Sequence, residues 1–267
     1  MKFSVIVPSF NSARYLEESL KSILVQRQEG IDLELIVVDG NSRDKTSRIL
    51  EQYAGQIDQL IVEEDDGPAH AINKGLQLAQ GDIISWLNAD DLYTSCALHR
   101  VLAVFSEHQS IGFCFGRCRM INGHGEEIRQ GITAFKEFFF PFSSRFTYQC
   151  INYISQPAMF FRKSALERIG ALRMDMVAAW DYEFILRLWR QGKGVSIQGD
   201  PLAAFRWHEQ SISGQHFALQ FKEEFDAAVE DAGRGSLQSI IHACVRWGIV
   251  GVYSAMQMKR SRTVAKG

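Results

Sequence analysis

The sequence predicts an α/β protein in which a mostly parallel β-sheet is flanked by helices. Between residues 3 and 87, short β-branched runs alternate three times with amphipathic stretches, which indicates successive right-handed βαβ units. The four expected strands end in polar segments, P-S-F-N, D-G-N-S, E-E-D-D-G and N-A-D-D. Because such sheets bind ligands at the carboxyl ends of their strands, these segments are expected to form one functional rim. The length of 267 residues suits one α/β unit.

The first half of the chain supplies this sheet in order. Strands are expected at residues 3–7, 33–38, 60–62 and 83–87. Pro8 closes the first strand, and Asn11 or Ser12 is placed to cap the helix that follows. Polar turns lead from the second strand into a helix ending near residue 53 and from the third strand into a helix with Pro68 in its first turn.

The second half is less regular. Strand patterns occur at residues 111–121, which are expected to form a strand pair, and near residues 195–197 and 202–205. The segment QPAMFFRKSALERIG indicates a strand running into a helix, and AWDYEFILRLWRQG an amphipathic helix. Between them lies the aromatic stretch FKEFFFPF, residues 135–142, where acceptor contacts are expected. Helices are also expected at residues 216–232 and from 236 to about 258, with a glycine-containing break between them.

Composition excludes several classes of protein. A net charge of −2 gives no overall basic field for nucleic acid. Five cysteines, without a C-x-x-C pair, do not suggest a disulfide framework or a zinc ribbon and suit a reducing cytosol. Lys2 is followed at once by a strand, so no signal peptide is expected, and no apolar run reaches about 18 residues. A cytoplasmic protein is therefore predicted.

Two common nucleotide-binding fingerprints are missing. The turn after the first strand lacks the G-x-G-x-x-G pattern, and no G-x-x-x-x-G-K-[ST] loop occurs. Asp39, at the end of the second strand, could accept hydrogen bonds from a ribose or a base, although a turn aspartate is the commoner explanation. Lys74 could reach a pyrophosphate or be an ordinary solvated lysine.

Asn88, Asp90 and Asp91 follow the fourth strand and suggest a metal site. Hard divalent cations bind oxygen ligands and usually keep waters and substrate phosphates, so Mg²⁺ or Mn²⁺ bridged to a diphosphate fits this position. The alternative is a helix N-cap before Leu92, provided by Asp91. Two carboxylates exceed the need of one cap, which favours a metal at Asp90.

Asp181 and His208 are further candidates. Asp181 lies between two aromatic residues near the start of a helix, and apolar surroundings raise the pKa of a carboxylate toward that of a useful general base. The alternative is a helix-terminal acid paired with Arg187 or Arg190. His208 follows a strand and is either a ligand or phosphate contact, or an ordinary loop histidine.

These features together resemble the family 2 glycosyltransferases, inverting enzymes with the Rossmann-like glycosyltransferase-A fold. The resemblance rests on six segments in order, SVIVPSFNSARYLEESLKSILVQ, ELIVVDGNSRDKT, EEDDGPAHAINKGLQLAQGDIISWLNADD, QPAMFFRKSALERIG, WDYEFILRLWRQG and FRWHEQSIS. The chain looks especially like bacterial enzymes of O-antigen and exopolysaccharide biosynthesis. The resemblance implies transfer of a sugar from a UDP-linked donor to a glycan or lipid-linked acceptor, with inversion.

The resemblance also assigns roles to residues. The implied nucleotide-sugar contacts are Pro8, Ser9, Asn11, Asp39, Asp66, Asn73, Lys74, Asn88 and Ala89. Asp39 matches the residue that reads the base, typically uracil. Asp90 matches the last carboxylate of the D-x-D site and is expected to bind Mn²⁺ or Mg²⁺, with His208 near the metal or diphosphate. Asp181 matches the base that deprotonates the acceptor hydroxyl.

The implied organisation is a catalytic domain over residues 1–232 and a C-terminal helical extension over residues 233–267. Residues 1–110 would hold the nucleotide sugar, and residues 111–232 the acceptor. Three positions depart from the family pattern, because Asn88, His70 and Trp180 stand where acidic residues are common.

Two alternatives to this enzyme remain. A neutral Asn88 supports a non-catalytic nucleotide-sugar-binding or scaffold protein of a polysaccharide assembly complex, whereas Asp181 favours the enzyme. A sugar nucleotidyltransferase is disfavoured because no glycine-rich, arginine-bearing loop follows the first strand.

Residues 236–262 suggest a membrane as a further partner. Charged and polar residues interrupt this stretch, which disfavours a transmembrane span. One helical face carries Ile241, Val245, Ile249 and Tyr253. Basic residues follow it at Lys259, Arg260, Arg262 and Lys266. Such a helix can lie on an anionic bilayer, or it can pack on the catalytic domain or a second subunit. Peripheral attachment at the cytoplasmic face of the inner membrane is predicted.

Overall fold

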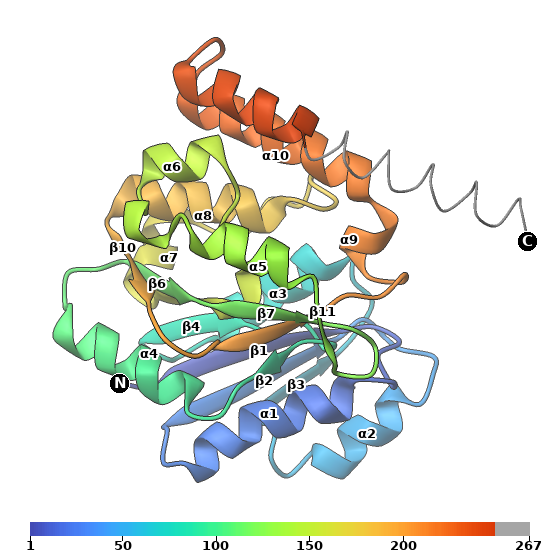
Figure 1. The fold of residues 1–267 in the computed structure, drawn as a ribbon. Helices are drawn as coiled ribbons and strands as arrows, with labels where there is room; N and C mark the ends of the chain where they lie inside the picture. Colours follow the sequence, from blue (N-terminus) through green and yellow to red (C-terminus); the bar gives the residue numbers. More distant parts are fainter. Residues whose placement is uncertain (249–267) are drawn as a thin grey trace, which may run out of the picture.

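The computed structural model describes the backbone of residues 1–248 and their side chains, except those of residues 212 and 213. A seven-stranded sheet forms the centre of the molecule and carries helices on both faces, as the sequence predicts (Figure 1). A second, four-stranded sheet lies beside it. The predicted α/β class is confirmed.

The central sheet has the strand order β10-β6-β9-β4-β1-β2-β3. Its strands are β1 (Phe3–Ser9), β2 (Leu33–Asp39), β3 (Gln59–Val62), β4 (Ile83–Trp86), β6 (Phe113–Gly116), β9 (Met159–Arg162) and β10 (Gly194–Ile197). Strands β1 to β4 are parallel where they pair, and β9 is antiparallel to both of its neighbours. The four strands expected in the first half are therefore all present.

The register of the first strands places their carboxyl ends at one rim. Ser9 lies opposite Asp39, Asp39 lies opposite Val62, and Ile6 lies opposite Trp86. The side chains of these strands alternate between two hydrophobic clusters, one on each face of the sheet. The sheet is therefore buried on both faces, and the polar segments gather where the strands leave it.

The helices of the first half are α1 (Leu16–Gln28), α2 (Thr46–Tyr53), α3 (Pro68–Leu78) and α4 (Ala97–Glu107). The predicted cap of α1 is wrong, because the helix begins at Leu16 and no side chain caps it. Asn11 adopts a left-handed backbone conformation, with φ of 49°, and its side chain binds the next loop instead.

The second sheet has the order β5-β11-β7-β8. Its strands are β5 (Leu92–Tyr93), β7 (Cys118–Ile121), β8 (Glu127–Ile128) and β11 (Ala203–Arg206). The predicted strand pair at residues 111–121 is wrong, because the two strands do not pair with each other. The two strands follow one another through Arg117, but β6 pairs in the central sheet and β7 in the second sheet.

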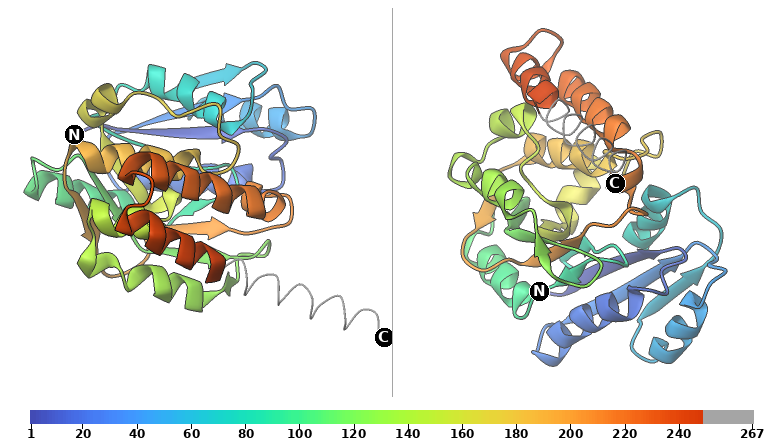
Figure 2. Two further views of the ribbon diagram at one scale, coloured as in Figure 1. Left: turned by 90° about the horizontal axis from the view of Figure 1, so that it is seen from above. Right: turned by 45° about the vertical axis from the view of Figure 1, so that its right-hand side comes forward.

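The remaining helices cover one side of the central sheet. They are α5 (Gln130–Glu137), η1 (Phe140–Phe142), α6 (Arg145–Cys150), η2 (Gln156–Ala158), α7 (Lys163–Ile169), α8 (Trp180–Gln191), α9 (Ile212–Gln215) and α10 (Phe217–Ala232). A further helix covers residues 237–248 and lies beside α10 (Figure 2). None of the helices within residues 1–248 has the length and apolar character of a membrane span.

The helix at residues 237–248 packs on the rest of the protein. His242 is buried, donates a hydrogen bond from Nδ1 to the carbonyl oxygen of Gln149 at 2.9 Å, and contacts the ring of Tyr182. Val245 packs against the main hydrophobic cluster. The face that was predicted to contact a membrane therefore faces protein at Ile241 and Val245. The rest of that prediction, residues 249–262, lies outside the described residues.

Candidate functional site

The loops after β1 and β2 are joined by hydrogen bonds centred on Asn11. The backbone N–H of Asn11 donates to Ser42 Oγ at 2.8 Å, and its side-chain oxygen accepts from the backbone N–H of Arg43 at 2.9 Å. Ser12 adds a third link, because its N–H donates to Thr46 Oγ1 at 2.8 Å. These bonds fix the two loops against each other at the rim of the sheet.

Asp39 is buried in the same network. One carboxylate oxygen accepts from the N–H of Ser42 at 2.8 Å, and the other accepts from the Ser42 hydroxyl at 2.7 Å. Asp39 therefore has the role of a turn aspartate, which the sequence analysis gave as the commoner explanation for this residue. Each oxygen keeps a further lone pair, so the turn role does not prevent a contact with a ligand.

The floor between these loops is formed by Pro8, Ser9 and Gly40. Pro8 and Ser9 are the last residues of β1, and both are buried. Ser9 Oγ has no hydrogen-bond partner in the described part of the chain. A Cβ at Gly40 would lie 2.7 Å from Asp65 Oδ2 and 3.2 Å from the Phe10 ring, so a side chain there would displace both. A buried hydroxyl without a partner at a strand end calls for a ligand or water.

The loop after β3 carries Asp66, and helix α3, which follows it, carries Lys74. The side chain of Asp66 is 81% exposed, and its backbone N–H donates to His70 Nδ1 at 3.1 Å. Lys74 Nζ lies 2.8 Å from Glu63 Oε1 and donates to the carbonyl oxygen of Glu64 at 2.9 Å. Lys74 is therefore held at the rim by the loop after β3 and is not an ordinary solvated lysine.

Asn73 has contacts that do not support its predicted role at the nucleotide sugar. It is buried, its side-chain nitrogen donates to the carbonyl oxygen of Leu172 at 2.9 Å, and its oxygen accepts from the N–H of the same residue at 2.8 Å. Asn73 thereby joins α3 to the segment before α8, a contact that spans 99 residues of sequence.

Substituting Asn73→Ala should therefore lower stability without weakening donor binding. Two buried backbone groups of Leu172 would lose their partners, at a cost of about 1–3 kcal/mol for each unsatisfied group. Urea unfolding would measure the loss, and Gln77→Ala on the exposed side of α3 is the matched control. A variant with wild-type stability and a raised dissociation constant for the sugar nucleotide would contradict this role.

The segment after β4 places two aspartates in different surroundings. Asp91 is fully buried and accepts hydrogen bonds from the N–H of Arg206 at 2.9 Å and from Asn88 Nδ2 at 3.1 Å. Burial, followed by the charge of Asp90, raises the pKa of Asp91 well above its usual range. The N-cap alternative is wrong, because Leu92 begins strand β5 and no helix starts there. Ala89, which directly precedes the two aspartates, is buried.

Asp90 and His208 meet at this rim. Asp90 Oδ2 lies 2.9 Å from His208 Nε2, and both side chains are partly exposed. The imidazole of His208 packs against the ring of Tyr15, with ring centres 5.3 Å apart. The two residues that the sequence suggested as metal ligands, 118 positions apart, are thus in direct contact.

Arg206 holds this arrangement in place and was not recognised as a functional residue from the sequence. Its side chain is 1% exposed. It donates to the carbonyl oxygen of Asp90 at 2.8 Å and to Glu18 at 2.6 Å, and its guanidinium lies 4.5 Å from the centre of the Tyr15 ring. A charged residue directly after a strand, beside His208, was the available signal.

The donor atoms of Asp90 and His208 suit a divalent cation. Two neighbouring ligand atoms at 2.0–2.1 Å from an octahedral ion lie about 3 Å apart, which agrees with the observed 2.9 Å. Within residues 1–248, no group of three His, Cys, Asp or Glu side chains gathers for a metal. The remaining positions would fall to water and substrate oxygens, as is usual for Mg²⁺.

Asp181 lies in the first turn of α8 and is partly buried. Burial, followed by the negative charge of Glu224, raises the pKa of Asp181 to about 6, although a hydrogen bond from the N–H of Tyr182 opposes the shift. Pairing of Asp181 with arginine is wrong, because Arg187 binds Glu183 and Arg190 binds Asp231.

Helix α10 places two glutamates at the start of α8 that the sequence did not reveal. Glu223 accepts hydrogen bonds of 2.8–3.0 Å from the N–H groups of residues 177, 178 and 179, directly before α8. Glu224 is buried and accepts from Asn152 at 3.1 Å and from Gln220 at 3.0 Å. The first glutamate fixes the start of α8, and the second adds a negative charge near Asp181.

Aromatic packing brings the start of α8 next to the end of β4, the strand that leads to Asp90. The rings of Trp86, at the end of β4, and Trp180, at the start of α8, have centres 5.9 Å apart. Gln156 donates to the carbonyl oxygen of Trp86 at 2.7 Å and holds the end of that strand. Asp181, the candidate base, and the segment that carries Asp90 therefore lie on elements that pack against each other.

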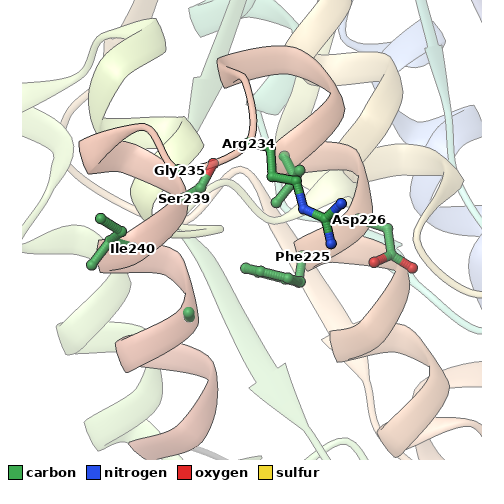
Figure 3. A pocket seen from close by; sticks show the side chains of 8 residues that line it. Phe225, Asp226, Arg234, Gly235, Ser239 and Ile240 are labelled. Atoms are coloured by element: carbon green, nitrogen blue, oxygen red, sulfur yellow. The ribbon is translucent and has the colours of Figure 1, made fainter.

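Two cavities of the described part lie away from these residues. The larger, of 480 Å³, opens between α10 and residues 237–248 and is bordered by Asp226, Arg234 and Ile240 (Figure 3). The second, of 200 Å³, is apolar and lies between α5, α6 and residues 237–248. None of the predicted site residues lines either cavity.

Comparison with known proteins identifies the family. The model for Glycosyl transferase family 2 matches residues 4–170, more than half of the chain. The chain belongs to glycosyltransferase family 2. Among its relatives, the PGL/p-HBAD biosynthesis glycosyltransferase of Mycobacterium tuberculosis is 33% identical over 186 residues, which is 67% of each chain. An uncharacterized glycosyltransferase of Nostoc is 33% identical over 137 residues, or 50% of this chain. The chain spans only 41% of that Nostoc protein.

Solved structures agree in fold with this glycosyltransferase. Residues 1–349 of Staphylococcus aureus TarS, in complex with UDP-GlcNAc, superpose with a TM-score of 0.67 at 21% identity. The match covers 91% of this chain and 69% of TarS 1–349. The mannosyltransferase PcManGT of Pyrobaculum calidifontis, in complex with GDP-Man and Mn²⁺, gives 0.65 at 19% identity and covers 100% of this chain and 81% of that one. The glycosyltransferase-A fold is thereby confirmed.

Proposed function

We propose that this glycosyltransferase moves a sugar from a UDP-linked donor to a glycan or lipid-linked acceptor, with inversion, in bacterial surface polysaccharide biosynthesis. The observation that carries the proposal is the pairing of Asp90 with His208 at the rim where α8 presents a carboxylate of raised pKa. TarS, whose name describes a poly(ribitol-phosphate) β-N-acetylglucosaminyltransferase and which was solved with UDP-GlcNAc, supports both a UDP-sugar donor and a polymer acceptor.

The donor is proposed to lie across the loops after β1 to β4. Asp39 would accept from the base with its free lone pairs, and the unpartnered hydroxyl of Ser9 would contact the nucleoside. The other proposed contacts are Pro8, Asn11, Asp66, Lys74, Asn88 and Ala89. The hydrogen bonds between Asn11 and the β2 loop support a rigid nucleotide pocket.

Asp90 and His208 are proposed to hold Mn²⁺ or Mg²⁺. The bound cation would supply positive charge next to the diphosphate that leaves the sugar. Arg206 fixes the backbone of Asp90 through its carbonyl oxygen and therefore keeps the carboxylate at the rim. PcManGT, which was solved with GDP-Man and Mn²⁺, supports metal use in this fold.

Asp181 is the proposed general base. Its carboxylate would take the proton from an acceptor hydroxyl as the hydroxyl oxygen attacks the anomeric carbon. The bond from that carbon to the diphosphate oxygen would break on the opposite face, so the configuration inverts. With a pKa of about 6, Asp181 is ionised at neutral pH and is a better proton acceptor than an ordinary aspartate.

The proposed organisation assigns the donor to residues 1–110 and the acceptor to residues 111–232, with residues 233–267 as a C-terminal extension. The enzyme is proposed to act at the cytoplasmic face of the inner membrane, where a lipid-linked acceptor would be presented. The proposed peripheral contact includes residues 249–262.

One set of measurements tests the proposal against the scaffold alternative. Thermal shifts with UDP-GlcNAc, UDP-glucose and GDP-mannose, each with and without Mn²⁺, would identify base, sugar and metal. We expect a UDP-sugar to stabilise the protein and the stabilisation to grow with Mn²⁺. Slow release of UDP from the same donor would establish an enzyme. Binding without any turnover, with or without added glycan acceptors, would support the scaffold protein.

Replacing Glu224→Gln should move the activity profile to lower pH. The negative charge of Glu224 raises the pKa of Asp181, so a neutral residue lowers that pKa and leaves the base ionised in more acidic solution. The glutamine keeps the oxygen that accepts from Asn152 and Gln220. The acidic limb of kcat/KM against pH measures the effect.

The control for this change is Glu230→Gln, at an exposed position of α10 where the side chain pairs with Arg173. It should leave the acidic limb unchanged. An unmoved limb in Glu224→Gln, in a protein of normal stability, would show that Glu224 does not influence the base.

A further inference from the structure

An exposed apolar surface covers α5, η1, α6 and the helix at residues 237–248. It is defined by Phe135, Phe138, Phe142, Phe146, Leu237, Ile240 and Trp247, which are between 48% and 75% exposed. The last three follow the spacing of one helical face. We refer to these seven residues as the aromatic surface.

The helix at residues 237–248 lies against α5 and α6 on one side, and its Ile240 borders the larger cavity next to α10 on the other. The apolar cavity between this helix and α5 and α6 is lined by Phe135 and Phe146 from one side and by Ile241 and Val245 from the other. Figure 2 shows α5 and α6 running beside the helix at residues 237–248. Soluble monomers rarely leave apolar patches of this extent in water, and such patches usually mark an interaction site.

The chain that follows this surface indicates the partner. Residues 249–267 begin directly after Trp247 and Gly248 and contain Lys259, Arg260, Arg262 and Lys266 but no acidic residue. Apolar aromatic rings next to basic residues are the composition that binds the interface of an anionic bilayer.

Helix α5 connects the aromatic surface to the proposed base. Phe135 points into the surface, whereas the next residue, Lys136, donates to Ser155 at 3.2 Å, and its positive charge lowers the pKa of Asp181. The surface therefore belongs to the same part of the protein as the base. A lipid-linked acceptor held in the bilayer would approach from this side.

We propose that the aromatic surface inserts its rings into the headgroup region of an anionic bilayer and holds the acceptor half of the enzyme against the membrane. This differs from the attachment expected from the sequence, in which Ile241 and Val245 would contact lipid, because both face protein. Only the link to a lipid-linked acceptor rests on the proposed function. Membrane binding itself does not.

Flotation of the full-length protein with vesicles tests the proposal. Vesicles of phosphatidylcholine with phosphatidylglycerol should carry the protein upward, and vesicles of phosphatidylcholine alone should carry much less. The double variant Phe138→Ser with Phe142→Ser removes the two most exposed phenylalanines, at 66% and 61% exposure, so the core is untouched. Its partition coefficient should fall at least about tenfold.

The matched control is Leu60→Ser with Val62→Ser, at exposed apolar residues of β3 outside the aromatic surface. This control should float like the wild type. A triple variant, Lys259→Gln, Arg260→Gln and Arg262→Gln, should lose the preference for anionic vesicles. Flotation is measured without donor or acceptor, so its outcome is independent of the proposed function. The phenylalanine variant should keep the melting temperature of the wild type, which excludes unfolding as the cause of lost flotation.

Three outcomes would overturn the proposal. The first is a wild-type protein that stays in the soluble fraction at low salt, and the second is a phenylalanine variant that floats as well as the wild type. The third is a dimer in solution that dissociates in the phenylalanine variant, which would assign the aromatic surface to a second copy of the chain.

Discussion

Asp181→Asn is expected to bind the sugar nucleotide as tightly as the wild type and to lose about 10²–10⁴ in kcat. The substitution keeps the size of the side chain and the oxygen that accepts from the N–H of Tyr182, but it removes the group that takes the proton. Donor binding should survive because the donor is proposed to lie on the loops after β1 to β4. Isothermal titration with the donor, followed by steady-state kinetics, separates the two effects.

Asp175→Asn is the matched control, since Asp175 is an exposed aspartate that precedes the same helix and pairs with Arg173. It should keep activity. If the Asp181→Asn variant has the kcat of the wild type, Asp181 is not the base. If the variant instead unfolds or fails to bind donor, the carboxylate has a structural role at the start of α8.

Asp90→Asn is expected to remove most metal-dependent activity while leaving the fold intact. A cation beside the leaving diphosphate supplies several kcal/mol of charge stabilisation, so kcat should fall by about 10²-fold or more. Arg206 holds the backbone carbonyl of Asp90, not its carboxylate, and the loop should therefore keep its shape. The Mn²⁺-dependent increase in melting temperature with UDP should disappear.

Asp200→Asn, at an exposed aspartate after β10, provides the control for this variant and should respond to Mn²⁺ as the wild type does. A second variant, His208→Ala, should weaken Mn²⁺ binding as well. Full activity of Asp90→Asn in buffer treated with chelator would exclude the metal assignment.

The elements of the first half could be predicted because their signals are local. A β-branched run followed by an amphipathic helix identifies itself within about 20 residues, and the parallel order then follows from chain connectivity. Asp90 and His208 were likewise each identified as candidate site residues from the sequence around them. Their contact required the fold, because β11 returns to the end of β4 after 118 positions of sequence.

The residues that the sequence did not reveal act through distant partners. Glu223 caps a helix that begins more than 40 positions earlier, and Asn73 pairs with the backbone of Leu172 across 99 positions. No periodicity encodes such pairs. The sequence also did not predict that β6 and β7 belong to different sheets. A continuous strand pattern does not indicate which sheet each half joins.

The buried side chain of Arg206 has a consequence for the order in which the protein is completed during synthesis. Its guanidinium reaches Glu18 and the carbonyl oxygens of Asp90 and Asn122, so one late residue connects three segments that leave the ribosome much earlier. Strands β1 to β4 can pair before this residue is made. We expect the nascent loop around Asp90 to remain unanchored until β11 emerges, so the end of the sheet that carries Asp90 is finished last.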